Sequence, residues 1–248
     1  MFKFFKQVNS FKGINIVVTG ASYGVGRGIA QGFSRFGANI AILARNQEKL
    51  EETKNLMEKK GSILVIPTDL SKHEEVNKAS EIIKKNFSNV DILINNAAGW
   101  YIGKLDEMSV ESIEKMISST VTGSILITKT LLSHIEKSTN PHIINILSTA
   151  ALPSKQIDPS VASIAFFAAK WGQAGFSEAL RGELKDYKVK VTSLYPGTIA
   201  TESSIDDSQD DIVTRFPGSL SINDMFEAVL FAVTRSSTAS IDSMIIRP

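Results

Sequence analysis

Apolar residues recur along this chain in two alternating patterns, which predict strands and helices in turn. Short runs rich in Ile, Val, Leu and Ala are typical of buried strands, and they fall at residues 14–19, 38–44, 62–66, 91–95, 142–147, 190–195 and 243–246. Longer segments with apolar residues at helical spacing follow the first run and recur at residues 47–60, 71–87, 109–137, 164–187 and 223–234. This alternation predicts a three-layer α/β fold, with a doubly wound parallel sheet of about seven strands.

The same pattern contains no repeat, no linker and no second set of elements. We therefore predict a single domain over residues 1–248, with residues 1–12 as an N-terminal extension. Residues 198–221 have no clear period and hold several aspartates, so we expect a lid lobe over a substrate. In such sheets a ligand binds at the carboxyl ends of the strands.

Composition narrows the function mainly by exclusion. The net charge is +1, which offers no general attraction to nucleic acid. No apolar run reaches the roughly 18 residues of a membrane span, so we expect no integral membrane association. The absence of cysteine excludes disulfides and fits a cytoplasmic protein. The three histidines share no ligand spacing, so no metal is predicted, and the expected partner is a small-molecule substrate.

The first strand runs into a glycine-rich turn that predicts a nucleotide phosphate site. Gly20, Gly24 and Gly26 separate the apolar run at residues 14–19 from a segment of helical spacing. Glycine lets the backbone approach a pyrophosphate closely. The N–H groups at the start of the following helix then face the anion, and the helix dipole adds to the attraction.

Four motifs in order carry a family resemblance. Thr-Gly-Ala-Ser-Tyr-Gly-Val-Gly at residues 19–26 is followed by Asn-Asn-Ala-Ala-Gly at 95–99, by Ser148 after a strand, and by Pro-Gly-Thr-Ile-Ala-Thr at 196–201. Together they resemble the short-chain dehydrogenase/reductase family over nearly the whole chain. The resemblance implies a Rossmann-like fold, a nicotinamide dinucleotide cofactor, and a homodimer or homotetramer formed through the long helices at residues 109–137 and 164–187.

Charge after the second strand bears on the cofactor. An acidic residue there would bond the ribose hydroxyls of NAD, but the chain has Ala44, Arg45 and Asn46, with no carboxylate before Glu48. Arg45 can pair with a 2′-phosphate, and the Ser22 hydroxyl can add to it, so we predict NADP(H) over NAD(H). The predicted cofactor-binding residues, several of them from the resemblance alone, are Gly20, Ser22, Tyr23, Gly24, Val25, Gly26, Arg45, Asn46, Asp69, Leu70, Asn96, Ala97, Ala98, Gly99, Lys170, Pro196, Gly197, Thr198 and Thr201.

The resemblance also implies a catalytic set, and this chain keeps only part of it. The family uses a Tyr and a Lys four residues apart on one helix, a Ser on the substrate oxygen and a supporting Asn. Lys170 and Ser148 match, but Phe166 occupies the tyrosine position and Thr120 the asparagine position. A positioned general acid is worth about 10²–10⁴ in rate, which Phe166 cannot supply.

Three explanations stay open at this point. In the first, another group donates the proton to a small apolar carbonyl or an activated C=C substrate; the candidates are Tyr101, Tyr195, Lys155, Ser163, Lys170 and water. In the second, the chain binds NADP(H) without turnover and acts as a sensor or partner subunit. In the third, Phe166 is an engineered replacement, which the unrelated departure at Thr120 argues against. We favour the first explanation.

Overall fold

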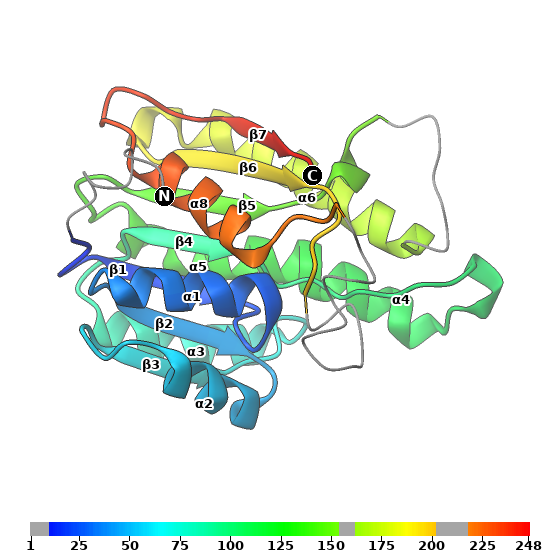
Figure 1. Cartoon of the computed structure of the whole chain (residues 1–248), viewed down its shortest axis with the longest axis horizontal. Coiled ribbons are helices and arrows are strands. Elements are labelled where there is room, and N and C mark those ends of the chain that lie inside the picture. The colour runs from blue at the N-terminus through cyan, green and yellow to red at the C-terminus, as the bar shows by residue number, and fades with distance from the viewer. Residues whose placement is uncertain (1–9, 154–161, 202–217) are drawn as a thin grey trace.

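The computed structural model describes residues 10–153, 162–201 and 218–248, which build one seven-stranded sheet with helices on both faces (Figure 1). The strands are β1 (Asn15–Thr19), β2 (Asn39–Ala44), β3 (Ile63–Pro67), β4 (Ile92–Asn95), β5 (His142–Ile146), β6 (Lys190–Pro196) and β7 (Ser243–Ile246). All neighbouring pairs are parallel, in the order β3-β2-β1-β4-β5-β6-β7. The prediction of a doubly wound parallel sheet is therefore confirmed.

Helices cover the two faces of the sheet in separate layers. Their bounds are α1 (Gly24–Arg35), α2 (Gln47–Leu56), α3 (His73–Asn86), α4 (Val110–Ile117), α5 (Gly123–Ile135), α6 (Ile164–Glu183) and α8 (Ile222–Val233). α1 and α8 pack on one face, and α3, α5 and α6 on the other (Figure 1). Within β1, Ile16 and Val18 face the first core while Val17 faces the second, as alternation along a strand requires.

Two glycines allow α8 to lie directly on α1. A β-carbon on Gly28 would fall 2.0 Å from a methyl of Ile222, and one on Gly32 would fall 2.3 Å from the ring of Phe226. Any side chain at these positions would force the helices apart. Small residues on one face of α1 thus fix where α8 crosses it.

Three helical segments differ from the bounds predicted from the sequence. α2 ends at Leu56, four residues early, because the next residue, Met57, is extended and its side chain enters the core. The segment predicted as one helix over 109–137 contains a π-helical stretch, Ser118–Thr122, between α4 and α5. α6 gives way after Glu183 to a 3-10 turn that ends at Lys188 in the left-handed region (φ 59°).

The proposed extension and lid fall partly outside the described residues. Of the extension only residues 10–12 are described, and there Phe11 is buried with its ring edge-on to Phe33, 5.0 Å away. Of the lid, the two ends are described and are joined by a bridge between Ile199 and Leu220, whereas residues 202–217 lie outside. No helix in the described ranges is both long and apolar enough to cross a bilayer.

A buried histidine begins the interior strand β5. His142 is 2% exposed, and its Nε2 lies 2.7 Å from Oγ1 of Thr192 on the neighbouring strand. The Thr192 hydroxyl donates its own hydrogen to the carbonyl of Ile241, so it must accept from the ring, which fixes the neutral tautomer with hydrogen on Nε2. Burial lowers the pKa of His142 from 6.5 to about 3, with a smaller effect of the Lys190 charge.

Because of His142, we expect acid to lower the stability of the fold already at pH values well above those at which carboxylates titrate. Below pH 6.5 the unfolded chain binds a proton at His142 that the folded chain refuses until about pH 3. The contribution of His142 to the free energy of unfolding should therefore fall as pH drops through this window, by up to about 1.4 kcal/mol per pH unit, and this contribution should be constant above it. Denaturant unfolding between pH 7.5 and 5 measures the slope. H142N should flatten it, whereas H73Q, at an exposed histidine, should keep the wild-type slope.

Candidate functional site

The carboxyl ends of the strands open into one cavity of about 1160 Å³. It lies where the strand order reverses, since β1 pairs with β2 on one side and with β4 on the other. Most predicted site residues line it, namely Gly20, Ser22, Tyr23, Val25, Arg45, Asn46, Asp69, Leu70, Asn96, Ala97, Ala98, Gly99, Tyr101, Ser148, Phe166, Lys170, Pro196, Gly197, Thr198 and Thr201. Gly24, Gly26 and Thr120 do not.

The glycines of the turn have different tasks. Gly20 and Gly24 have φ of +66° and +53°, a backbone region that disfavours side chains. Gly26 allows close packing instead, because a β-carbon there would fall 2.3 Å from the Gly20 carbonyl oxygen and 2.5 Å from the Asn96 amide nitrogen. Gly24 and Gly26 therefore shape the turn from behind the cavity wall.

Asn96 and Thr19 join the turn to the loop after β4. The Asn96 side-chain amide donates to the carbonyls of Thr19 (3.0 Å) and Gly20 (3.1 Å). In return, the Thr19 hydroxyl accepts from the backbone N–H groups of Asn96 (3.0 Å) and Ala97 (3.1 Å). These four bonds bring the ends of β1 and β4 together as one wall.

The amino end of α1 carries a positive potential toward the cavity. No side chain among the described residues caps the helix, whose N-cap is Tyr23, and its first turn has no acidic residue. The first N–H groups of a helix have no partner within it, and they are the positive end of its dipole. This arrangement is suited to an anion.

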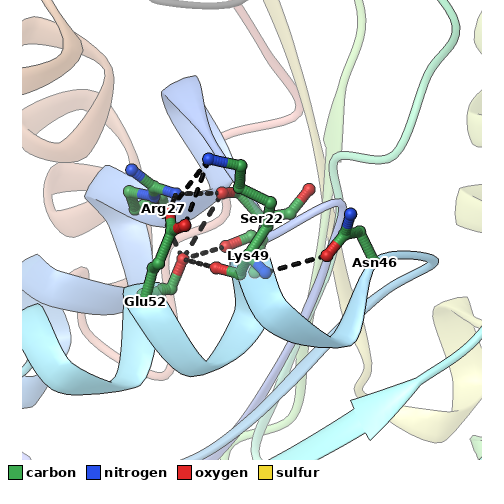
Figure 2. Close-up of polar contacts among 7 residues, drawn as sticks. Ser22, Arg27, Asn46, Lys49 and Glu52 are labelled. Carbon is green, nitrogen blue, oxygen red and sulfur yellow. Dashed lines mark hydrogen bonds and ion pairs between the residues drawn. The ribbon is translucent and has the colours of Figure 1, made fainter.

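Arg27 and Thr53 hold the back of the turn in place, and the sequence analysis missed both. Figure 2 shows Arg27 reaching the backbone carbonyl of Ser22 and the carboxylate of Glu52. The Nε of Arg27 also donates to the Thr53 hydroxyl (3.0 Å), which lies 2.9 Å from the carbonyl of Ala21. The carbonyls of residues 21 and 22 are thus turned toward α2. The sequence signal for Arg27 was its position directly after Gly26 of the turn.

The end of β2 presents a cation at the cavity rim. Arg45 is exposed there and lines the cavity. Asn46 also lines it, but its side-chain oxygen accepts from the backbone N–H of Lys49 (2.9 Å) and so caps α2 (Figure 2). Lys49 itself is paired with Glu52 at 3.1 Å. Arg45 is therefore the cation of this group that lines the cavity.

Asp69 borders the same rim after β3. Its partial burial raises its pKa, but hydrogen bonds from the side chain and backbone of Ser71 outweigh burial, and the Arg45 charge adds to them, so the net shift is downward. The carboxylate is thereby kept ionised, and its Oδ1 accepts from the backbone N–H and the hydroxyl of Ser71. The neighbouring Leu70 packs on Gly123, where a β-carbon would fall 2.7 Å from its side chain.

Ser148, which follows β5, and Phe166, on α6, line the same cavity as residues of the glycine turn. The Ser148 oxygen accepts from the N–H of Ala150 (3.1 Å), which leaves its hydroxyl hydrogen available as a donor. Phe166 lies in the first turn of α6, 6% exposed, and Trp100 packs edge-on against it with ring centroids 4.8 Å apart. The position that the resemblance assigns to tyrosine is thus part of an aromatic wall without an ionisable group.

Lys170 lies one turn further along α6 and is buried. Its Nζ donates to the carbonyl of Ile146 (2.7 Å) and to the side-chain oxygen of Gln173 (3.0 Å). Burial lowers the pKa of Lys170 from 10.5 to about 7. Thr120 is also buried, behind the wall, and its hydroxyl has no hydrogen-bond partner among the described residues.

The candidate proton donors are not equally placed. Tyr101 lines the cavity, and its backbone carbonyl accepts from the N–H of Ser163 (2.9 Å), which ties its loop to the start of α6. Ser163 is fully buried and caps α6, and Tyr195 is buried in a separate cluster; neither lines the cavity. Burial raises the pKa of Tyr195, with a contribution from the Glu178 charge. Lys155 lies outside the described residues.

In the described ranges, no three His, Asp or Glu side chains are grouped as metal ligands would be. The described residues of the cavity walls offer hydroxyl groups, the buried Lys170, a helix N-terminus and the charged side chains Arg45, Asp69, Glu111 and Lys115.

Comparison with known proteins agrees with this architecture. The family profile described as short chain dehydrogenase matches residues 15–211. A protein described as an uncharacterized oxidoreductase, from Staphylococcus aureus strain MW2, is 30% identical over 232 residues, which cover 94% of this chain and 96% of the relative.

Two solved structures of similar fold contain dinucleotides. A metagenomic short-chain oxidoreductase in complex with NADP is 25% identical, with a TM-score of 0.79 over 96% of this chain and 98% of that one. A 3-ketoacyl-(acyl-carrier-protein) reductase from Brucella melitensis, complexed with NADH, is also 25% identical, with a TM-score of 0.82 over the same shares of the two chains. The family match, the parallel sheet and the glycine turn lead to one conclusion: this chain belongs to the short-chain dehydrogenase family.

Proposed function

We propose that the chain is an NADP(H)-dependent oxidoreductase that acts on a small apolar carbonyl or activated C=C substrate through a non-standard proton donor. The observation that carries this proposal is the composition of one cavity. Gly20 and Ser22 of the turn, Ser148 and Lys170 all line it. Phe166 stands at the position that the resemblance assigns to tyrosine. The groups that serve a dinucleotide and a substrate oxygen are present, and only the usual acid is replaced.

The chain's residues fit NADP(H). The uncapped start of α1 suits the pyrophosphate, Arg45 suits a 2′-phosphate, and Lys170 suits ribose hydroxyls on the far side of the cavity. The dinucleotides in two related structures support the same class of cofactor. When bound, the nicotinamide supplies or accepts the hydride. The chain's part is to hold the substrate, exclude water and move the proton.

Ser148 and the aromatic wall define the substrate side. The Ser148 hydroxyl, with its oxygen already engaged by Ala150, donates to a substrate carbonyl oxygen. Phe166 and Trp100 give the cavity an apolar surface, which favours an apolar substrate.

Tyr101 is the proton donor in this proposal. It lines the cavity beside Trp100, and the bond from Ser163 to its carbonyl keeps its loop at the start of α6. Tyr195 and Ser163 are disfavoured because neither lines the cavity. In conjugate reduction the proton reaches the enolate after the hydride reaches carbon, so this donor need not occupy the position of Phe166.

A second candidate function is an NADP(H)-binding protein without turnover, acting as a sensor or partner subunit. The packing of Phe166 against Trp100 favours it, since an ionisable group is replaced by a closed aromatic contact while the cofactor side is kept.

Three further expectations remain proposals. A homodimer or homotetramer formed through α4, α5 and α6 is supported by the exposed apolar side chains Ile125, Ile164 and Trp171 on α5 and α6. A cytoplasmic location and a lid within residues 198–221 complete the proposed picture.

A substrate panel separates the two functions. We expect the protein to oxidise NADPH with enones and to be slow with simple ketones and aldehydes, because protonation of an enolate tolerates a displaced donor. Absorbance at the NADPH band measures turnover. Y101F should lose roughly 10²-fold or more of that rate and still bind NADPH. Silence with every substrate, together with tight NADPH binding, would favour the sensor function.

Arg45 should set the cofactor preference. Quenching of tryptophan fluorescence, to which Trp100 in the cavity wall contributes, should report NADPH binding at micromolar levels and much weaker NADH binding. R45A should weaken NADPH by about tenfold, equivalent to about 1.4 kcal/mol, and leave NADH unchanged. K54A, which removes a partly exposed lysine of α2 that does not line the cavity, is the control of equal charge. Equal affinities for NADPH and NADH in the wild type would contradict the assignment.

Restoring the hydroxyl at residue 166 should restore the standard chemistry. F166Y should raise carbonyl reductase activity by up to about 10²–10⁴, because the new phenol stands one turn from Lys170 and on the wall of Ser148. F167Y, which adds a hydroxyl at the next residue of the same cavity, should give no gain. An inactive F166Y with normal NADPH affinity would mean that the wall no longer has the standard geometry.

A further inference from the structure

A buried residue that belongs to none of the four motifs, Gln173, bonds to the Lys170 nitrogen. An ammonium group has three donors, and two of them are used by the carbonyl of Ile146 and the side-chain oxygen of Gln173. Because Lys170 also lines the cavity, its remaining donor is left for a ligand there. Gln173 is fully buried and lies almost one turn beyond Lys170 on α6.

The orientation of the Gln173 amide is fixed by its second contact. Its nitrogen donates to the Ser124 hydroxyl of α5 (3.1 Å), and Ser124 donates in turn to the carbonyl of Thr120 (2.7 Å). Since the Ser124 hydrogen is already used, Ser124 can only accept from Gln173. The amide oxygen must therefore face Lys170. The chain of bonds ends in the π-helical stretch Ser118–Thr122.

The polar side chains of this network are buried, so that each depends on its hydrogen bonds. Ser124 is 2% exposed and Lys170 3%, so each would carry a desolvation penalty if its bonds were lost. The Phe166 ring lies 5.9 Å from the Lys170 nitrogen and offers it no hydrogen-bond acceptor. No charged side chain in the described part of the chain contributes to the pKa of Lys170, so its partners there are neutral dipoles.

We propose that Gln173 is the positioning residue of Lys170: it holds the lysine nitrogen against the end of β5 so that the remaining donor faces the cavity. This inference rests on the proposed function, because the ligand that Lys170 meets is the ribose of the dinucleotide. Ser124 fixes the amide, and Gln173 transmits that constraint to Lys170. The role is distinct from the motif residues, which act on the cavity directly.

The test compares Q173E with Q173L. Lysine side chains labelled with ¹³C are titrated by NMR, and the signal that disappears in K170R is assigned to Lys170. In the wild type this signal should titrate near pH 7, because burial sets the pKa of Lys170 at about 7. In Q173E a carboxylate replaces a neutral oxygen 3.0 Å from the ammonium, so the midpoint should rise by one pH unit or more.

Cofactor affinity supplies the second readout. Q173L removes the acceptor, and NADPH should bind at least tenfold more weakly at pH 7 in a variant that still melts cooperatively. Q173E keeps an acceptor and should restore most of that affinity, which a purely space-filling role would not predict. S124A, which frees the amide, should fall between the wild type and Q173L. T128V removes an equally buried hydroxyl one turn along α5, bonded to Asn95, and should match the wild type.

The possible results distinguish a failure of the positioning role of Gln173 from a failure of the proposed function. Folded Q173L and Q173E with wild-type titration and wild-type NADPH affinity would overturn the positioning role, even if the enzyme is active. A wild-type chain that binds no dinucleotide, but whose Lys170 midpoint still rises in Q173E, would overturn the proposed function and support Gln173 as the partner of Lys170.

Discussion

The site depends on one close contact, between Gly26 of α1 and the Gly20 carbonyl with the Asn96 amide above it. A single added carbon at Gly26 would come within 2.3 Å of that carbonyl. The contact lets α1 start immediately behind the end of β1, and the Asn96 bonds then draw in the loop after β4. The dipole of α1, the turn and the β4 loop consequently meet at the point where strand order reverses.

Behind this contact, the turn is supported by residues that do not line the cavity. Arg27 and Thr53 bind the carbonyls at residues 21 and 22 from the side of α2, and Glu52 balances the charge of Arg27 (Figure 2). A turn whose carbonyls are engaged elsewhere keeps its N–H groups toward a ligand. The same preorganisation recurs across the cavity, where Gln173 and the Ile146 carbonyl restrain Lys170.

The two sides of the cavity have diverged unequally from the family pattern. The glycine turn keeps the motif residues of the resemblance, and Arg27 and Thr53 brace it from behind. Phe166 and Trp100 form an aromatic contact at the position where the resemblance implies an acid, and the Thr120 hydroxyl is buried without a partner in the described chain. Lys170 is surrounded by neutral dipoles and an aromatic ring, which is why its charge is costly. In the proposed function, the proton comes from Tyr101 in the loop after β4 rather than from α6.

The sequence by itself determined the parallel α/β fold and the position of the turn, because hydrophobic period and glycine spacing are local signals. The departures at Phe166 and Thr120 rest on what the resemblance implies. Tertiary structure decided the rest. α2 stops at Leu56 because Met57 is drawn into the core, and Gly26 shapes the turn without lining the cavity. The role of Gln173 could not be predicted from the sequence, because it depends on simultaneous hydrogen bonds to Lys170 and to Ser124 on another helix. Contacts between helices are set by packing in three dimensions, which no spacing along the chain encodes.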